Sequence, residues 1–86
     1  MREVREADAS VIERGQSEGR LRISGSAYDL SAGEPILVWL ADLGWMPARV
    51  EWDSRLGWVA YVRESTGRGE ASVLVFLCPG LKARRP

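Results

Sequence analysis

The sequence predicts a small all-β domain of five or six antiparallel strands that curl into a barrel. Three observations predict this class. Apolar and polar residues alternate from residue 20 onward, the apolar runs are rich in β-branched and aromatic residues, and short segments containing Gly, Asp or Pro separate them. Strands joined by short turns are typical of an antiparallel meander, and curling removes the exposed edges that such a sheet would otherwise leave.

The composition limits the class of protein. The chain has 86 residues, 45% of them hydrophobic, and its 12 basic and 12 acidic residues cancel, which excludes a disordered chain. The longest apolar runs, residues 36–41 and 73–78, have six residues each, whereas a membrane-spanning helix needs about 20. Residues 1–9 are charged, so we expect no signal peptide. The single Cys78 cannot form an internal disulfide, which favours a reducing, cytoplasmic location.

Residues 1–19 are expected to form a leader outside the barrel, either a short helix over residues 2–14 or a flexible segment. Gly15 is a natural helix stop, and residues 16–19 resemble a linker. A helix this short is marginal in isolation. Its apolar stripe at helical spacing is thin and consists of Val4, Ala7, Val11 and Ile12.

The barrel itself is expected to span residues 20–78. Residues 42–44 and 54–57 are predicted to be tight turns, and the polar residues 64–72 a flexible loop. The two-residue period predicts strands at residues 20–24, 28–31, 36–41, 45–53, 58–63 and 73–77.

Pro47 lies inside the predicted strand 45–53. Proline cannot donate a hydrogen bond to a neighbouring strand, so it belongs at an edge, at a bulge or where its nitrogen faces outward. We therefore expect a bent strand at this point rather than the centre of a flat sheet.

The four tryptophans are spaced by six, seven and six residues. This spacing could fit a helix, but Gly44, Pro47 and Gly57 interrupt any helix in this region. We therefore assign the tryptophans to three adjacent strands. No internal repeat is visible. The four residues are Trp39, Trp45, Trp52 and Trp58.

Alternation along the strands predicts which side chains form the core. Strands 36–41 and 73–77 are apolar on both faces, and a barrel interior covers only one of them. The other face needs the leader helix, the chain's own loops or a second copy of the protein. The predicted core consists of Leu21, Ile23, Ile36, Val38, Leu40, Met46, Ala48, Val50, Trp52, Val73 and Val75.

The residue types argue against an enzyme. The chain has no histidine, which removes the usual general base and histidine metal ligand, and Cys78 alone cannot form a thiolate zinc centre. We expect Cys78 to be a small buried residue. Glu51 and Asp53 lie on one strand face beside Arg49, a pattern typical of an exposed face with ion pairs. We predict no catalytic residues, no cofactor and no metal.

A protein partner or self-association is the favoured role. Exposed aromatic residues suit a protein interface and need no net positive charge, and a second copy would supplement the limited core of so short a chain. No membrane partner and no small-molecule substrate are inferred. The predicted contact residues are Trp45, Arg49, Glu51 and Tyr61.

The alternative is an accessory nucleic-acid binder. Arginine beside an outward tryptophan can combine a phosphate contact with a stacking platform, and the tail, residues 79–86, is basic unless it is merely a solvated end. Zero net charge and the neighbouring carboxylates argue against this role. Its predicted contacts are Trp45 with Arg49, Lys82, Arg84 and Arg85.

Five motifs stand between residues 28 and 58. They are Tyr28-Asp29-Leu30, Gly33-Glu34-Pro35, Leu37-Val38-Trp39-Leu40, the segment from Gly44 to Asp53 that contains Gly-Trp-Met-Pro-Ala-Arg-Val-Glu-Trp-Asp, and Gly57-Trp58. Together they resemble a family of small bacterial domains of unknown function with an SH3-like β-barrel. The similarity covers roughly residues 20–63, and the leader and tail lie outside it. The resemblance implies a small SH3-like barrel and brings no catalytic residue and no ligand.

Overall fold

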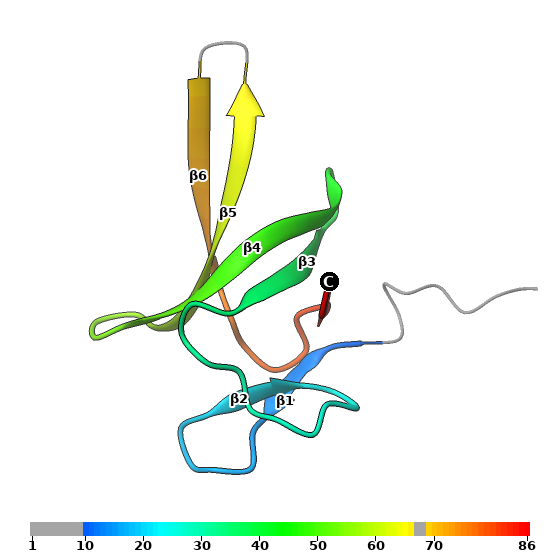
Figure 1. Cartoon of the computed structure of the whole chain (residues 1–86), viewed down its shortest axis with the longest axis vertical. Coiled ribbons are helices and arrows are strands. Elements are labelled where there is room, and N and C mark those ends of the chain that lie inside the picture. The colour runs from blue at the N-terminus through cyan, green and yellow to red at the C-terminus, as the bar shows by residue number, and fades with distance from the viewer. Residues whose placement is uncertain (1–9, 67–68) are drawn as a thin grey trace, which may run out of the picture.

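The structure, a computed structural model, describes residues 10–66 and 69–86, and these form an all-β fold without a helix (Figure 1). The all-β prediction is confirmed. In the described part of the chain, no helix is long and apolar enough to cross a membrane. The strands are β1 (Ile12–Arg14), β2 (Leu21–Ile23), β3 (Pro35–Leu40), β4 (Gly44–Asp53), β5 (Gly57–Thr66), β6 (Gly69–Phe76) and β7 (Ala83–Arg84).

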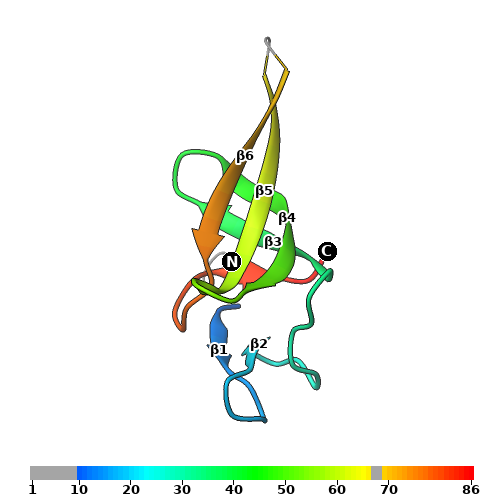
Figure 2. The same ribbon diagram turned by 90° about the vertical axis from the view of Figure 1, so that its left-hand side faces the viewer.

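The strands form two antiparallel sheets. β1 pairs with β2, and the five-stranded sheet has the order β6-β5-β4-β3-β7. A bridge between Val11 and Lys82 joins the two sheets, and the Ile12 amide donates to the Leu81 carbonyl at 2.7 Å. Within residues 10–66 and 69–86 the strands do not close into a barrel: β6 lies at one edge of the large sheet (Figure 2).

Pro47 marks the point where the large sheet divides. The Val50 amide donates toward β3, at the Glu34 carbonyl, so the odd-numbered positions of β4 face β5. The position of Pro47 therefore faces β5 without an N–H to donate, and the β4–β5 pairing ends at the next residue, with Ala48 opposite Val62. Beyond this pair, β5 and β6 continue as a two-stranded arm that projects from the sheet (Figures 1 and 2).

The predicted loop 64–72 is wrong for most of its length. Backbone pairing of β5 with β6 runs without interruption from Val59 opposite Phe76 to Thr66 opposite Gly69. The polar residues in this segment lack the apolar alternation by which strands are recognised in a sequence. Ladder hydrogen bonds do not require that alternation, so the hairpin extends through polar sequence.

The prediction of a helical leader is wrong for the described residues 10–14, and residues 1–9 lie outside the described part of the chain. Ile12–Arg14 is strand β1, and residues 15–20 form its hairpin loop to β2 rather than a linker. A short amphipathic stripe is a weak helix signal, whereas pairing with β2 and with residues 80–82 satisfies this backbone on both sides. The folded unit therefore begins before residue 20.

The C-terminal segment, too, belongs to the fold. Ala83 is buried and Ala83–Arg84 form β7 beside β3. Arg85 forms an ion pair with Glu34 and donates to the hydroxyl of Ser26 at 3.1 Å. Residues 80–84 are thus paired backbone and not a loose tail, because they have β1 and the residues before it on one side and β3 on the other.

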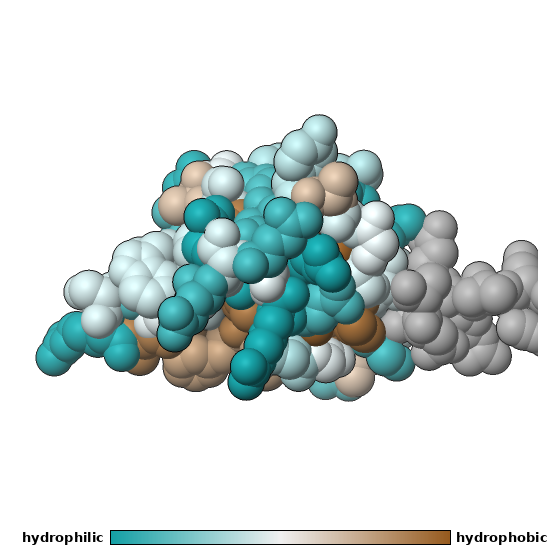
Figure 3. Space-filling model, turned by 90° about the horizontal axis from the view of Figure 1, so that it is seen from below, coloured by the Kyte–Doolittle hydropathy of each residue, from teal (hydrophilic) through white to brown (hydrophobic). Residues whose placement is uncertain are grey.

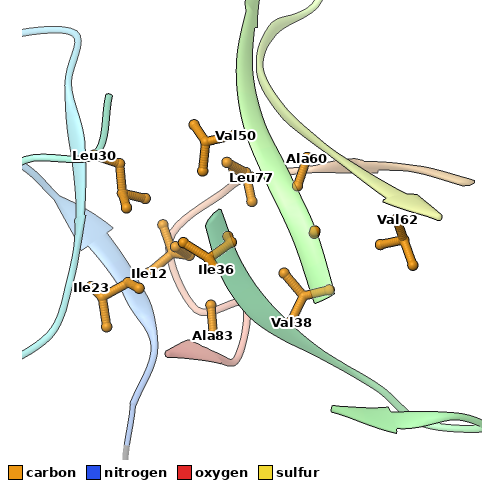
Figure 4. Packing of buried hydrophobic residues seen from close by; sticks show 11 residues of the cluster. Ile12, Ile23, Leu30, Ile36, Val38, Val50, Ala60, Val62, Leu77 and Ala83 are labelled. Carbon is orange, nitrogen blue, oxygen red and sulfur yellow. The ribbon is translucent and has the colours of Figure 1, made fainter. Parts of the chain in front are cut away.

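The core lies between the small sheet and the concave side of the large one (Figure 4). Five predicted core residues are buried, namely Ile23, Ile36, Val38, Ala48 and Val50, and four pack partly buried against them, namely Leu21, Leu40, Met46 and Val75. Trp52 and Val73 were wrongly placed in the core: they are 56% and 42% exposed. The buried residues missing from the prediction are Ile12, Leu30, Val59, Ala60, Val62, Leu77 and Ala83.

The outward apolar faces of β3 and β6 are covered to different extents. On β3, Leu37 and Trp39 are half-buried, and Arg84 of β7 lies opposite Leu37. On β6, Phe76 lies on the face opposite Val75 and is 56% exposed. Part of the exposed apolar surface predicted for these strands is therefore present at the edge strand β6.

Replacing Ile12 tests whether β1 belongs to the core. Ile12 is 1% exposed, so we expect Ile12→Ala to lower the free energy of unfolding by about 2–5 kcal/mol through lost burial and a cavity. Ile12→Val, the matched control, should cost about 0.5–1.5 kcal/mol. Urea unfolding followed by circular dichroism measures both. Equal stability of Ile12→Ala and the wild type would remove β1 from the core.

Candidate functional site

The four tryptophans lie in two hairpins of the same construction. In each hairpin, a tryptophan is followed by one strand residue, a three-residue turn, a glycine and the second tryptophan. Trp39 faces Trp45 across β3 and β4, and Trp52 faces Trp58 across β4 and β5. We call residues 39–45 the first Trp hairpin and residues 52–58 the second Trp hairpin.

The geometry of the two tryptophan pairs is nearly identical. The ring centroids are 5.5 Å apart with an interplanar angle of 68° in the first pair, and 5.1 Å apart with an angle of 66° in the second. This edge-to-face arrangement suits the quadrupoles of the rings. An arginine covers the second ring of each pair: Arg84 lies 5.0 Å from the Trp45 centroid, and Arg20 lies 5.7 Å from the Trp58 centroid.

The sequence contains a signal for this construction that the search for repeats missed. Residues 39–45 and 52–58 share the pattern Trp-x-x-x-Leu-Gly-Trp, once as Trp-Leu-Ala-Asp-Leu-Gly-Trp and once as Trp-Asp-Ser-Arg-Leu-Gly-Trp. A spacing of six residues, with a three-residue turn between the strands, places the two tryptophans of each pair directly opposite each other on neighbouring strands. The expectation that no internal repeat exists is therefore wrong at this scale.

Both hairpins need their glycine. Gly44 has a φ of 79° and Gly57 a φ of 86°, in the left-handed region that other residues enter only at a cost. A left-handed residue after a three-residue turn returns the chain into the antiparallel partner strand. In the second Trp hairpin, Asp53 Oδ1 also accepts the amides of Arg55 and Leu56 at 2.8 and 2.9 Å.

The second Trp hairpin borders a cleft of about 770 Å³, which we call the aromatic cleft. The β1–β2 loop and the turn of the second Trp hairpin are two walls of the lining, and the residues at and after the end of β6 complete it. Figure 1 shows the β1–β2 loop and the β4–β5 turn projecting to the same side of the molecule, and Figure 2 looks onto that side. The lining includes residues 14–21, Trp52, Leu56, Gly57, Trp58 and residues 76–79.

Hydrogen bonds hold the loop wall of the aromatic cleft in place. The Trp58 indole N–H donates to the Gly19 carbonyl at 2.8 Å, which ties the tip of the loop to β5. At the base of the loop, Asp29 accepts the amides of Gln16 and Ser17 at 2.8 and 3.3 Å. The cleft is therefore a pre-formed feature, and little order must be gained when something binds in it.

The predicted contact residues share one face of the large sheet, opposite the core. Arg49 lies directly across from Tyr61, and its guanidinium pairs with the Glu51 carboxylate at 2.9 Å. Trp45 is on the same face four residues earlier, beside Trp39 and Arg84. The structure thus places Arg49, Glu51 and Tyr61 together, and Trp45 in a separate cluster further along β4.

The residues predicted for nucleic-acid contact are engaged within the protein. Arg49 pairs with Glu51 and Arg85 with Glu34. Arg84 stacks on Trp45, and Lys82 contributes its carbonyl to the Trp39 amide. Two of these basic side chains, those of Arg49 and Arg85, are therefore already paired with carboxylates.

The carboxylates of Glu51 and Asp53 each make a local contact, and the thiol of Cys78 lies at the surface. Glu51 pairs with Arg49, and Asp53 caps the turn of the second Trp hairpin. Cys78 is exposed and borders the aromatic cleft, so the expectation that it is buried is wrong: the chain has already left β6 at this residue. Among residues 10–66 and 69–86, no group of three His, Cys, Asp or Glu side chains could hold a metal ion.

Sequence reasoning missed the aromatic cleft, since it assigned Trp52 to the core. Trp52 lies on the core side of β4 but is 56% exposed, two residues beyond the buried Val50. Comparisons with protein-family models, curated proteins and solved structures give no match for this chain.

The two glycines provide a test of the repeated construction. Gly44→Ala and Gly57→Ala should each lower the free energy of unfolding by about 1–2 kcal/mol, because alanine is strained at a positive φ. Asparagine tolerates this conformation better, so Gly44→Asn and Gly57→Asn should cost less than the alanine variants. Thermal and urea unfolding measure all four. Unequal losses for the two alanine variants would contradict an equivalent backbone in the two hairpins.

Proposed function

We propose that this protein is a non-catalytic interaction module that binds a segment of a protein partner in the aromatic cleft. The observation that carries the proposal is the gathering of exposed apolar side chains there. Trp52 and Leu56 are among the large hydrophobic residues with exposed side chains, and both line this cleft beside the half-buried Trp58. Exposed aromatic residues in a concave, pre-formed site are typical of binding surfaces.

The physical character of the cleft supports a protein ligand. Its volume lies in the usual range for ligand sites, roughly 300–1,000 Å³, so it can take a few side chains rather than a whole domain. Aromatic residues bury much area at low conformational cost, and such residues dominate the energetics of protein interfaces. Among the described residues the Trp52 indole N–H makes no hydrogen bond and is available to a partner carbonyl.

The face that carries Arg49, Glu51 and Tyr61 is the second surface on which a protein could bind. Its aromatic content is lower, since Trp45 on this face packs against Trp39 and Arg84. Self-association through the exposed part of β6 belongs to the same class of function, and light scattering over a concentration series of the full chain distinguishes it from binding to another protein.

For the fold, we propose an SH3-like arrangement and kinship with the small bacterial family that the motifs resemble. The Val11–Lys82 bridge supports this, because it joins the small sheet to β7 and wraps the strands around one core. A reducing, cytoplasmic location is proposed as well. The single free thiol of Cys78 supports it.

Selection from a random peptide library tests the proposed function. We expect the full chain to enrich peptides from a phage-displayed library of about twelve random residues, and Trp52→Ala to weaken binding of the selected peptides about tenfold or more. Trp52 is largely exposed, so the variant should keep its fold. Circular dichroism checks the fold, and fluorescence anisotropy with a synthetic peptide measures the affinity.

Tyr61→Ala is the matched control, because Tyr61 is a partly exposed aromatic residue on the opposite face of the sheet. It should leave the affinity within about twofold. A strong loss with Tyr61→Ala and none with Trp52→Ala would move the binding site to the other face. A library that yields no peptide at all would refute the peptide-binding function.

A further inference from the structure

The aromatic cleft combines an apolar floor with a positively charged rim. Its apolar side chains, called the floor below, are those of Trp52, Leu56 and the half-buried Trp58. Among the described residues of the lining, Arg14 and Arg20 are basic and Glu18 alone is acidic. Arg55 sits next to Leu56, on the turn that forms one wall. In Figure 3 the molecule is seen from the end with the small sheet, and hydrophobic residues show between hydrophilic ones.

The nearby carboxylates of Asp29 and Asp53 form hydrogen bonds with backbone amides and no ion pair with these arginines among the described residues. Asp53 directs its oxygen to the amides of Arg55 and Leu56, and Asp29 accepts the amides of Gln16 and Ser17. The Asp53 carboxylate thus faces the backbone of its own turn, and the Asp29 carboxylate faces the backbone of the β1–β2 loop. The guanidinium groups of Arg14 and Arg55 make no hydrogen bond or ion pair among the described residues, although the chain as a whole has zero net charge.

Arg20 contributes charge from a fixed position. Its Nη2 donates to the Leu30 carbonyl at 2.7 Å, and its guanidinium lies over the Trp58 ring. These two contacts hold the cation at the wall of the cleft without cancelling its charge, because a carbonyl and an aromatic ring carry no formal negative charge. A ligand in the cleft thus meets a pre-positioned arginine beside an aromatic floor.

From this charge pattern we infer that the partner segment is an acidic peptide: an extended stretch with a large apolar side chain for the floor and carboxylates for Arg14 and Arg20. The inference rests on the proposed function. Charge complementarity carries it, since arginine pairs with carboxylates through two parallel hydrogen bonds where the geometry allows.

A nucleic acid fits the same cleft less well. Its backbone carries a charge at every nucleotide and is usually tracked by a continuous basic groove. Here Glu18 interrupts the rim, and Arg49 and Arg85 outside the cleft are paired with Glu51 and Glu34. A short acidic peptide needs only the few cations that the cleft offers.

Charge variants of the full chain test the inference with the selected peptides. We expect Asp and Glu to be over-represented beside an aromatic or aliphatic residue in these peptides. Arg14→Glu should lower the affinity for the tightest-binding peptide about tenfold. Raising NaCl from about 50 to about 500 mM should also lower the affinity of the wild-type chain for this peptide. Glu18→Gln should strengthen binding.

Ala41→Glu is the matched control, since it adds a carboxylate to the exposed turn of the first Trp hairpin, away from the cleft. It should change the affinity less than about twofold. The variants are read by fluorescence anisotropy with the synthetic peptide, and by circular dichroism for the fold.

The outcomes separate this inference from the function on which it rests. Enriched peptides that depend on Trp52 but show no acidic excess, with Arg14→Glu binding as the wild type does, would overturn the acidic partner and leave the peptide-binding function standing. Failure to enrich any peptide overturns both. Tighter binding of a single-stranded oligothymidine of about twelve nucleotides than of any peptide would overturn both in favour of nucleic acid.

Discussion

The alternation of side chains along β4 is the constraint on which the rest of the structure depends. Trp45 and Trp52 are seven positions apart on one continuous strand, an odd number, so they point to opposite faces. Each meets a second tryptophan in the neighbouring strand through a turn of the same design. One strand therefore places one aromatic pair on each side of the sheet, and Pro47 between them ends the pairing with β5.

The two aromatic pairs have different consequences because different segments cover them. The first pair lies beside β7, and Arg84 packs over it. The second lies beside the β1–β2 loop, which reaches it through the Trp58–Gly19 hydrogen bond and Arg20. Trp52 therefore stays exposed and borders a cleft. The same local construction serves as a covered cluster in one place and as a candidate binding site in the other.

The core depends on segments from both ends of the described chain. Ile12 from β1 and Ala83 from β7 are buried side by side in sequence-distant strands that share backbone hydrogen bonds. In so small a domain the fraction of surface that folding buries is limited, so these few residues matter. The ion pair of Arg85 with Glu34 attaches the C-terminal segment to the loop before β3. The scaffold that positions the cleft thus relies on contacts between remote parts of the sequence.

By itself, the sequence determined the all-β class, the approximate positions of β2 to β5, both tight turns and the need for a special environment at Pro47. These follow from local physics: a two-residue hydrophobic period, glycine at a positive φ and the missing amide of proline. Only the tertiary structure decided that Ile12–Arg14 is a strand, that residues 83–84 join the sheet and that Trp52 is exposed. The two strands depend on backbone pairing with remote residues, and the exposure of Trp52 depends on how much of β4 other segments cover. Neither pairing with remote residues nor cover by other segments produces a hydrophobic period in the neighbouring sequence.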